Sequence, residues 1–237
     1  MGRRINPLII PLGTFLLAIL LSLAAGARTS RLLARVAAGP TCDDPVTLPI
    51  CVRKILEANG GSGGSTMNFT PQALSDLEKA MNEIWAACCI SFTLTAGSDV
   101  TLPADAFKDG KLPVANSDGQ TVKLNEGTKK LFKQMNSTKC LNLYYVHDAI
   151  AAPKSAGDLK GAALIGDNGM VVDDNVSGAL DAHEAGHNLG LKDETGEGNL
   201  MNGVDSGGQV QNGLREDQCK TAHKLAKKYL RDFAKAK

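Results

Sequence analysis

The sequence predicts an α+β fold. Helices are expected near residues 71–89, 177–189 and 215–234, the first and last with apolar residues at helical spacing, and shorter segments between them have the patterns of strands. The 237 residues suffice for one domain with a real core. A hydrophobic fraction of 43% and a charged fraction of 22% exclude wholesale disorder and a multi-span membrane protein. The formal net charge of +1 gives no global field, so no nucleic-acid partner is expected.

The N-terminus is typical of an export signal. Arg3 and Arg4 form a short basic region, residues 8–25 are almost wholly apolar, and Ala25-Gly26-Ala27 provides a small-x-small pattern before a cut. An uncleaved membrane anchor is the alternative, because the apolar run approaches the roughly 20 residues that span a bilayer. We therefore expect residues 1–27 to be a signal peptide or anchor, 28–41 a short pro-segment or disordered stub, and 42–237 the folded domain, in an extracellular or periplasmic compartment.

The cysteines agree with export. Their even number, six, predicts up to three disulfides, and the absence of a CxxC pattern disfavours a cysteine zinc site. Cys88 and Cys89 are adjacent, so we expect them to bond to different distant partners. Cys42 and Cys51 are close in the sequence and are expected to form a local pair.

The first part of the domain predicts a strand, a helix and a second strand. Residues 46–52 have the pattern of a short strand, which Pro49 places near a sheet edge because proline donates no ladder hydrogen bond. Thr70 is a good N-cap and Pro71 suits the first helical position, so a helix begins there. Residues 90–95 (ISFTLT) then alternate like a half-buried strand.

The middle of the chain is less regular. Residues 97–139 are polar with glycine and proline interruptions, which predicts a long loop with one short helix near residues 123–135. Residues 140–146 (CLNLYYV) form the clearest strand of the sequence. Ala162–Ile165 and Met170–Val172 are expected to be two more short strands.

The penultimate helix carries the chemistry. Its segment His183-Glu184-Ala185-Gly186-His187 places two histidines one turn apart on one face, with about 5–6 Å between their Cβ atoms. Both imidazoles can therefore reach one tetrahedral Zn²⁺. Glu184 is rotated by about 100° from that face. This position suits a general base beside an activated water rather than a metal ligand.

Zinc needs a third protein ligand while one position stays open. Gly190 is an apt helix terminator, because glycine takes a left-handed conformation without steric cost, and a sharp turn there would bring Asp193 back under the metal. Glu194 is the neighbouring rival for this role. A remote carboxylate from Glu216 or Asp205 is a further alternative, but it leaves Gly190 unexplained.

Residues 183–193 (HEAGHNLGLKD) resemble the metzincin zinc metallopeptidases. They match the family's HExxHxxGxxH pattern, except that Asp193 replaces the third histidine. An aspartate there is the variant of snapalysin-type members, and the surrounding residues are more generally similar to matrixins. Residues 199–203 (NLMNG) fit the family's Met-turn. The resemblance covers roughly residues 66–205, and its strong part is residues 183–203.

This resemblance implies a fold, an activity and a set of residue roles. The implied fold is zincin-like, with a twisted mixed sheet, an active-site helix, a C-terminal helix and a substrate cleft across an edge strand near Ala162–Ile165. The implied activity is that of a secreted, monomeric zinc endopeptidase acting on protein or peptide substrates. The implied roles are metal ligand for His183, His187 and Asp193, general base for Glu184, and hydrophobic floor below the metal for Met201.

Three other functions stay open. The first is a zinc-binding or toxin-like module without turnover, the second a membrane-tethered processing protease that keeps residues 1–27, and the third a zinc hydrolase acting on a non-peptide amide. The substrate-binding residues are unknown, because residues 203–213 have no readable pattern.

The remaining polar candidates are weaker. His147 and His223 are interpreted as surface or packing residues. Asp167, Asp173 and Asp174 could bind a structural Ca²⁺ through loop oxygens, with ordinary turn acids as the alternative.

Overall fold

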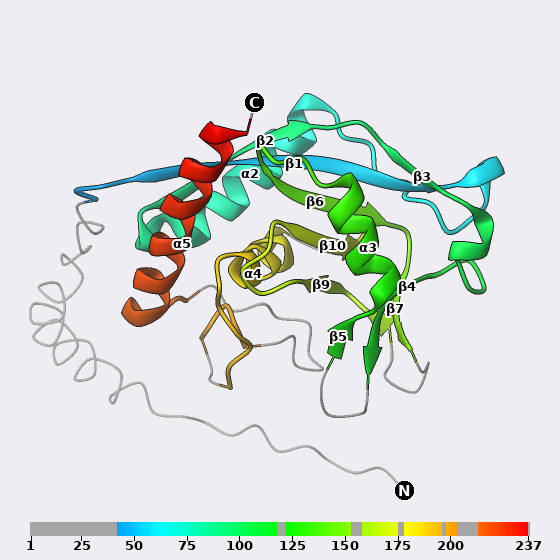
Figure 1. Ribbon diagram of the computed structural model, residues 1–237. Helices are drawn as coiled ribbons and strands as arrows, with labels where there is room; N and C mark the ends of the chain where they lie inside the picture. Colours follow the sequence, from blue (N-terminus) through cyan, green and yellow to red (C-terminus); the bar gives the residue numbers. More distant parts are fainter. Residues whose placement is uncertain are drawn as a thin grey trace, which may run out of the picture. The chain divides into compact units, whose positions relative to one another are not determined.

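The computed structural model describes residues 42–117, 122–152, 158–174, 178–195, 198–202 and 213–236. The expected leader and pro-segment, residues 1–41, lie outside this range. Helices and strands are mixed along the described chain, so the α+β class is confirmed (Figure 1). Across the described residues, no helix is long and apolar enough to cross a membrane.

A mixed sheet forms the centre of the fold. Its strand order is β2-β1-β6-β10-β9, and β3 pairs with the far end of β1. The strands are β1 (Val46–Glu57), β2 (Ile90–Ala96), β3 (Val100–Leu102), β6 (Leu141–Val146), β9 (Gly161–Ala163) and β10 (Gly169–Asp173). All neighbours are parallel except β9, which is antiparallel to β10 at the end of the sheet. Among the described strands β9 is therefore an edge strand, as expected, but it spans Gly161–Ala163 rather than Ala162–Ile165.

The prediction of a short edge strand at residues 46–52 is wrong. β1 has 12 residues and lies between β2 and β6 in the interior of the sheet. The N–H of Val46 donates on the β2 side, to the carbonyl of Cys89, and donors alternate along a strand, so the nitrogen of Pro49 faces β6. The ladder with β6 begins one residue later, at Ile50. The missing N–H of the proline thus interrupts no pairing with β6.

The prediction of one long loop at residues 97–139 is also wrong. Besides β3, this region contains β4 (Leu112–Ser117), β5 (Val122–Leu124) and the expected helix, α3 (Glu126–Met135). β4 and β5 join β7 (Ala149–Ala152) and β8 (Asp158–Leu159) in a small second sheet of order β5-β4-β7-β8. Strands of three to six residues, interrupted by glycine and proline, show too little alternation to be recognised.

Three helices pack against one face of the central sheet: α2 (Pro71–Trp85), α4 (Gly178–Asn188) and α5 (Glu216–Lys235) (Figure 1). β6 is buried on both faces. Leu143 belongs to the core beneath these helices, whereas Tyr144 belongs to a second core, where its ring stacks on Phe132 of α3. Neighbouring strand residues point to opposite faces, so the sheet separates two cores.

The helix boundaries follow the predicted capping signals. Thr70 Oγ1 accepts a hydrogen bond from the N–H of Ala73 (3.1 Å), and Pro71 is the first residue of α2. α5 also lies where the apolar stripe predicts it. α4 is described from Gly178, because the expected first residue, Ser177, lies outside the described residues.

Three disulfides connect the fold: Cys42–Cys89, Cys51–Cys140 and Cys88–Cys219. The prediction that Cys88 and Cys89 have different, distant partners is confirmed. The expected local pair of Cys42 with Cys51 is wrong, because Cys51 lies inside extended β1, about 16 Å beyond its first residue. There it reaches Cys140, which immediately precedes the neighbouring strand β6.

Candidate metal centre

Helix α4 carries the histidine segment through the interior. Its residues from Leu180 to Asn188 are all buried, and it packs against α2 and against β9 and β10 (Figure 1). Trp85 of α2 donates an indole hydrogen bond to the carbonyl of Ala182 (3.2 Å), and the hydroxyl of Tyr145 on β6 donates to Asp181 (2.8 Å). These bonds fix the helix in the core, where polar groups need partners.

Three side chains converge at the end of α4. His183, His187 and Asp193 each offer one potential metal-ligand atom, and these three atoms lie within 4.8 Å of one another. Asp193 Oδ1 lies 3.3 Å from His183 Nε2 and 3.4 Å from His187 Nε2. The histidines are buried, whereas the side chain of Asp193 is 69% exposed, so the cluster opens to solvent on the aspartate side.

Backbone carbonyls orient both imidazole rings. His183 Nδ1 lies 2.8 Å from the carbonyl oxygen of Leu200, and His187 Nδ1 lies 2.9 Å from that of Leu191. A carbonyl only accepts, so each Nδ1 carries a proton, and Nε2 is the ring nitrogen that faces the cluster and is available to a metal. Metal-ligating histidines are typically held in this way.

The glycine turn explains how Asp193 reaches the histidines. Gly190 has φ +86°, its N–H donates to the carbonyl of His187, and the N–H of Leu191 donates to that of Gly186, both at 2.9 Å. This is a Schellman motif, which ends α4 where the sequence predicts. The same turn directs the carbonyl of Leu191 at His187 and returns the chain so that Asp193 faces both rings.

Met201 packs directly beneath the helix. It is fully buried, and a Cβ atom built on Gly186 would lie only 2.5 Å from its Sδ. Glycine at this position of the histidine segment therefore lets the turn at residues 199–202 approach α4. The neighbouring Leu200 is then close enough for its carbonyl to bind His183.

Glu184 is a buried carboxylate beside the edge strand. Its Oε2 has no hydrogen-bond partner among the described residues, and its side chain lies so close to Gly161 of β9 that a Cβ there would collide with it. Burial raises the pKa of Glu184, although His187 and His183 oppose the rise. Gly161 is not among the site residues that the sequence predicts. A glycine at the start of a strand can mark such a close approach.

The cluster is suited to a cation. Burial lowers the pKa of His187, but the hydrogen bond to Asp193 and the nearby charge of Glu184 outweigh it and raise the pKa to about 9. Hydrogen bonds from His183 and His187 lower the pKa of Asp193 well below its usual range. Two imidazole nitrogens and a carboxylate oxygen are a donor set that Zn²⁺ takes, and both rings are already oriented. The residues present therefore fit a zinc ion.

The rival carboxylates do not join this cluster. Glu194 turns toward Arg215, whose Nη2 lies 2.9 Å from its Oε1. Glu216 pairs with Lys220 on the exposed surface of α5. Asp205 lies outside the described residues.

The other two histidines lie elsewhere. His147 is beside Asp174, with 3.8 Å between Nδ1 and Oδ2, and His223 Nε2 lies 2.8 Å from the carbonyl oxygen of Asp44. Neither belongs to the metal cluster.

The acidic residues considered for Ca²⁺ are bound to protein groups. Asp173 is buried and pairs with Lys160 (3.2 Å), and Asp174 accepts hydrogen bonds from Ser65 (2.8 Å) and Thr66 (2.6 Å). Within the described ranges, the histidine cluster is the one group of three or more such side chains that could hold a metal. The calcium site stays a prediction without structural support.

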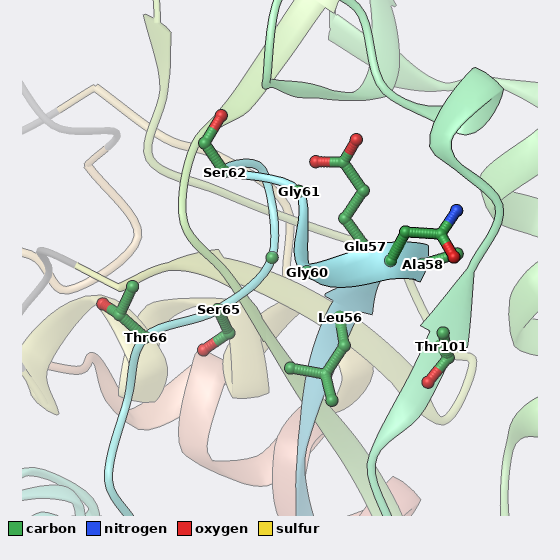
Figure 2. Close-up of a pocket in the computed structure, with 11 residues that line it drawn as sticks. Leu56, Glu57, Ala58, Gly60, Gly61, Ser62, Ser65, Thr66 and Thr101 are labelled. Carbon is green, nitrogen blue, oxygen red and sulfur yellow. The ribbon is translucent and has the colours of Figure 1, made fainter.

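A separate hollow lies where β1 runs into a glycine-rich loop, residues 60–64. Its volume is about 410 Å³, and Figure 2 shows the side chains of Leu56, Glu57 and Thr101 around it. Glu57 accepts a hydrogen bond from the N–H of Gly63 (2.8 Å), which holds the loop against the strand. None of its lining residues belongs to the histidine cluster.

Similarity to known proteins is found among solved structures. No protein-family model and no curated protein matches it. Among solved structures, a protein in a chaperone–substrate complex is similar with a TM-score of 0.42 and 16% identity, over 79% of this chain and 35% of that chain. Metalloproteinase-II from Bacteroides fragilis is similar with a TM-score of 0.42 and 14% identity, over 76% of this chain and 53% of that chain. The present chain thus spans about a third of the first and about half of the second.

Proposed function

We propose that the protein is a zinc-dependent endopeptidase of the metzincin type. The observation that carries the proposal is the convergence of His183 Nε2, His187 Nε2 and Asp193 Oδ1 beside the buried carboxylate of Glu184. In this proposal the first three residues hold zinc. When bound, zinc supplies Lewis acidity, which polarises a peptide carbonyl and lowers the pKa of water.

Glu184 is assigned the proton transfers. Its position next to the histidines, but outside the converging donor atoms, suits a base rather than a ligand. The carboxylate accepts a proton from the attacking water and then delivers the proton to the departing amine nitrogen. Burial supports this role, since it makes the carboxylate a stronger base.

The edge strand supports a peptide substrate. β9 pairs only with β10 among the described strands, so its other side is available for an extended peptide that adds as a further strand. Gly161 of this strand adjoins Glu184, which places a peptide bound there next to the base. Backbone hydrogen bonds would hold the substrate independently of its sequence.

Secretion and a monomeric state are further parts of the proposal. The three disulfides support an extracellular or periplasmic compartment, where such bonds persist. The segments assigned to the signal peptide and pro-segment, residues 1–41, await N-terminal sequencing of the exported protein.

A peptide digest tests the activity directly. The purified protein is expected to bind one zinc ion and to cleave a proteome-derived peptide library, and a zinc chelator should abolish the cleavage. Zinc bound without hydrolysis of any peptide would favour the non-catalytic module instead. Cleavage that persists after complete zinc removal would contradict the proposal.

Substitution of Gly161 tests the contact between β9 and the base. We expect Gly161→Ala to lower kcat by about 10–100-fold, because the added methyl displaces Glu184. The loss is smaller than the full contribution of a general base, because the carboxylate is still present. Zinc affinity should be retained, since the three atoms nearest to the added methyl all belong to Glu184, which is not among the converging ligand atoms. Gly127→Ala in α3 is the matched control and should leave kcat unchanged. Equal kcat values for the two variants would refute the predicted contact.

A further inference from the structure

A pair of buried amide side chains joins the Met-turn to helix α5. Asn199 Nδ2 donates to Gln218 Oε1 (2.9 Å), and Gln218 Nε2 donates back to Asn199 Oδ1 (3.2 Å). Two backbone N–H groups fix which end of each amide is the oxygen: Met201 donates to Asn199 Oδ1 (2.8 Å) and Arg215 to Gln218 Oε1 (2.9 Å). Each amide oxygen therefore accepts two hydrogen bonds and each amide nitrogen donates one, and both side chains are buried.

Each amide belongs to a different structural unit. Asn199 opens the turn that carries Leu200 and Met201, and its own carbonyl accepts from the N–H of Asn202 (3.0 Å). Gln218 lies in the first turn of α5, next to Cys219. The disulfide of Cys219 fixes this turn covalently to the end of α2. The amide pair thus ties the Met-turn to a rigid support.

The Met-turn orients one of the two histidines, His183. The carbonyl of Leu200, one residue after Asn199, accepts the hydrogen bond from His183 Nδ1 (2.8 Å). His187 is oriented by Leu191 instead, which belongs to the glycine turn at the end of α4. The two rings are therefore held by separate segments of the chain.

From this arrangement we propose that Asn199 and Gln218 are positioning residues for the metal centre, acting on His183 through the carbonyl of Leu200. This inference rests on the proposed zinc function. Loss of the Gln218 amide leaves the buried Nδ2 of Asn199 without an acceptor, so Asn199 must move or rotate. The carbonyl of Leu200 then loses its fixed direction, and His183 is no longer preorganised for the metal.

The first test is the zinc affinity of Gln218 variants. Gln218→Met keeps a similar side-chain volume but makes no amide hydrogen bonds, and Gln218→Ala removes both the volume and the hydrogen bonds. If one variant does not fold, the other provides the measurement. Competition with a chelator should show that zinc alone binds about 10–100-fold more weakly, the effect typical of losing an outer-shell partner. The matched control is Asn82→Ala, which deletes a side chain bonded to the backbone of Phe92 at 2.6 and 3.1 Å. It should lower the unfolding midpoint without changing zinc affinity.

The second test separates positioning from general loosening. In the zinc-loaded protein, NMR follows exchange of the two ring Nδ1–H protons with solvent. The Gln218 variants should speed exchange at His183 and leave His187 unchanged, because only His183 depends on Leu200.

The outcomes distinguish the positioning role of the amide pair from the proposed zinc peptidase function. A wild-type protein that binds no zinc would overturn both. If the wild type binds zinc and cleaves peptides, but Gln218→Met matches Asn82→Ala in zinc affinity, the positioning role is refuted and the peptidase stands. Equal acceleration of exchange at both histidines would likewise refute it.

Discussion

Replacing Glu184 with glutamine is expected to slow peptide hydrolysis by about 10²–10⁴-fold while zinc binding is retained. Glutamine has nearly the same shape but cannot accept a proton from water. The carboxylate is not among the atoms that converge on the cluster, so its loss removes no ligand. Initial rates on a cleavable peptide, measured beside the zinc content of the same sample, check both halves of the prediction.

Loss of folding must be separated from loss of chemistry. Glu184 is buried and its Oε2 has no partner among the described residues, and an unpaired buried charge costs free energy. We therefore expect that the neutral amide does not lower the unfolding midpoint. Glu194→Gln is the matched control, since this carboxylate is turned toward Arg215. A Glu184→Gln variant that cleaves as fast as Glu194→Gln would end the proposed mechanism.

The features that the sequence predicted best are encoded by neighbouring residues. The spacing of His183 and His187 follows from helix geometry alone. Gly190 ends the helix through its own backbone conformation, and the bend that it makes determines where Asp193 lies. Thr70 likewise caps α2 through a contact three residues away. Local stereochemistry therefore sufficed to predict the centre of the candidate site.

The features that the sequence did not predict depend on pairing between distant segments. The partner of Cys51 is set by which strand lies beside β1. That strand is β6, and Cys140, which immediately precedes it, is 89 residues from Cys51 in the sequence. The contact of Gly161 with Glu184 exists only because β9 lies beside α4. Gln218 had no local pattern that would link it to Asn199, and only the packing of α5 brings the two amides together.

The last prediction concerns Asp193, the proposed third ligand. Asp193→Ala is expected to weaken zinc binding by more than about 100-fold, because loss of an outer-shell partner alone weakens it by about 10–100-fold. Its carboxylate oxygen faces both Nε2 atoms, and no other described carboxylate joins that group. Chelator competition measures the change. Asp193→His should bind zinc more tightly than Asp193→Ala, because imidazole nitrogen is also a zinc ligand.

The neighbouring residue provides the decisive control. Glu194 is the carboxylate next in sequence, but its side chain pairs with Arg215 in a partly exposed ion pair and does not face the histidines. Glu194→Ala should therefore leave zinc affinity close to that of the wild type. If Glu194→Ala loses zinc while Asp193→Ala keeps it, the ligand set is wrong, because the turn after Gly190 then directs the other carboxylate at the histidines.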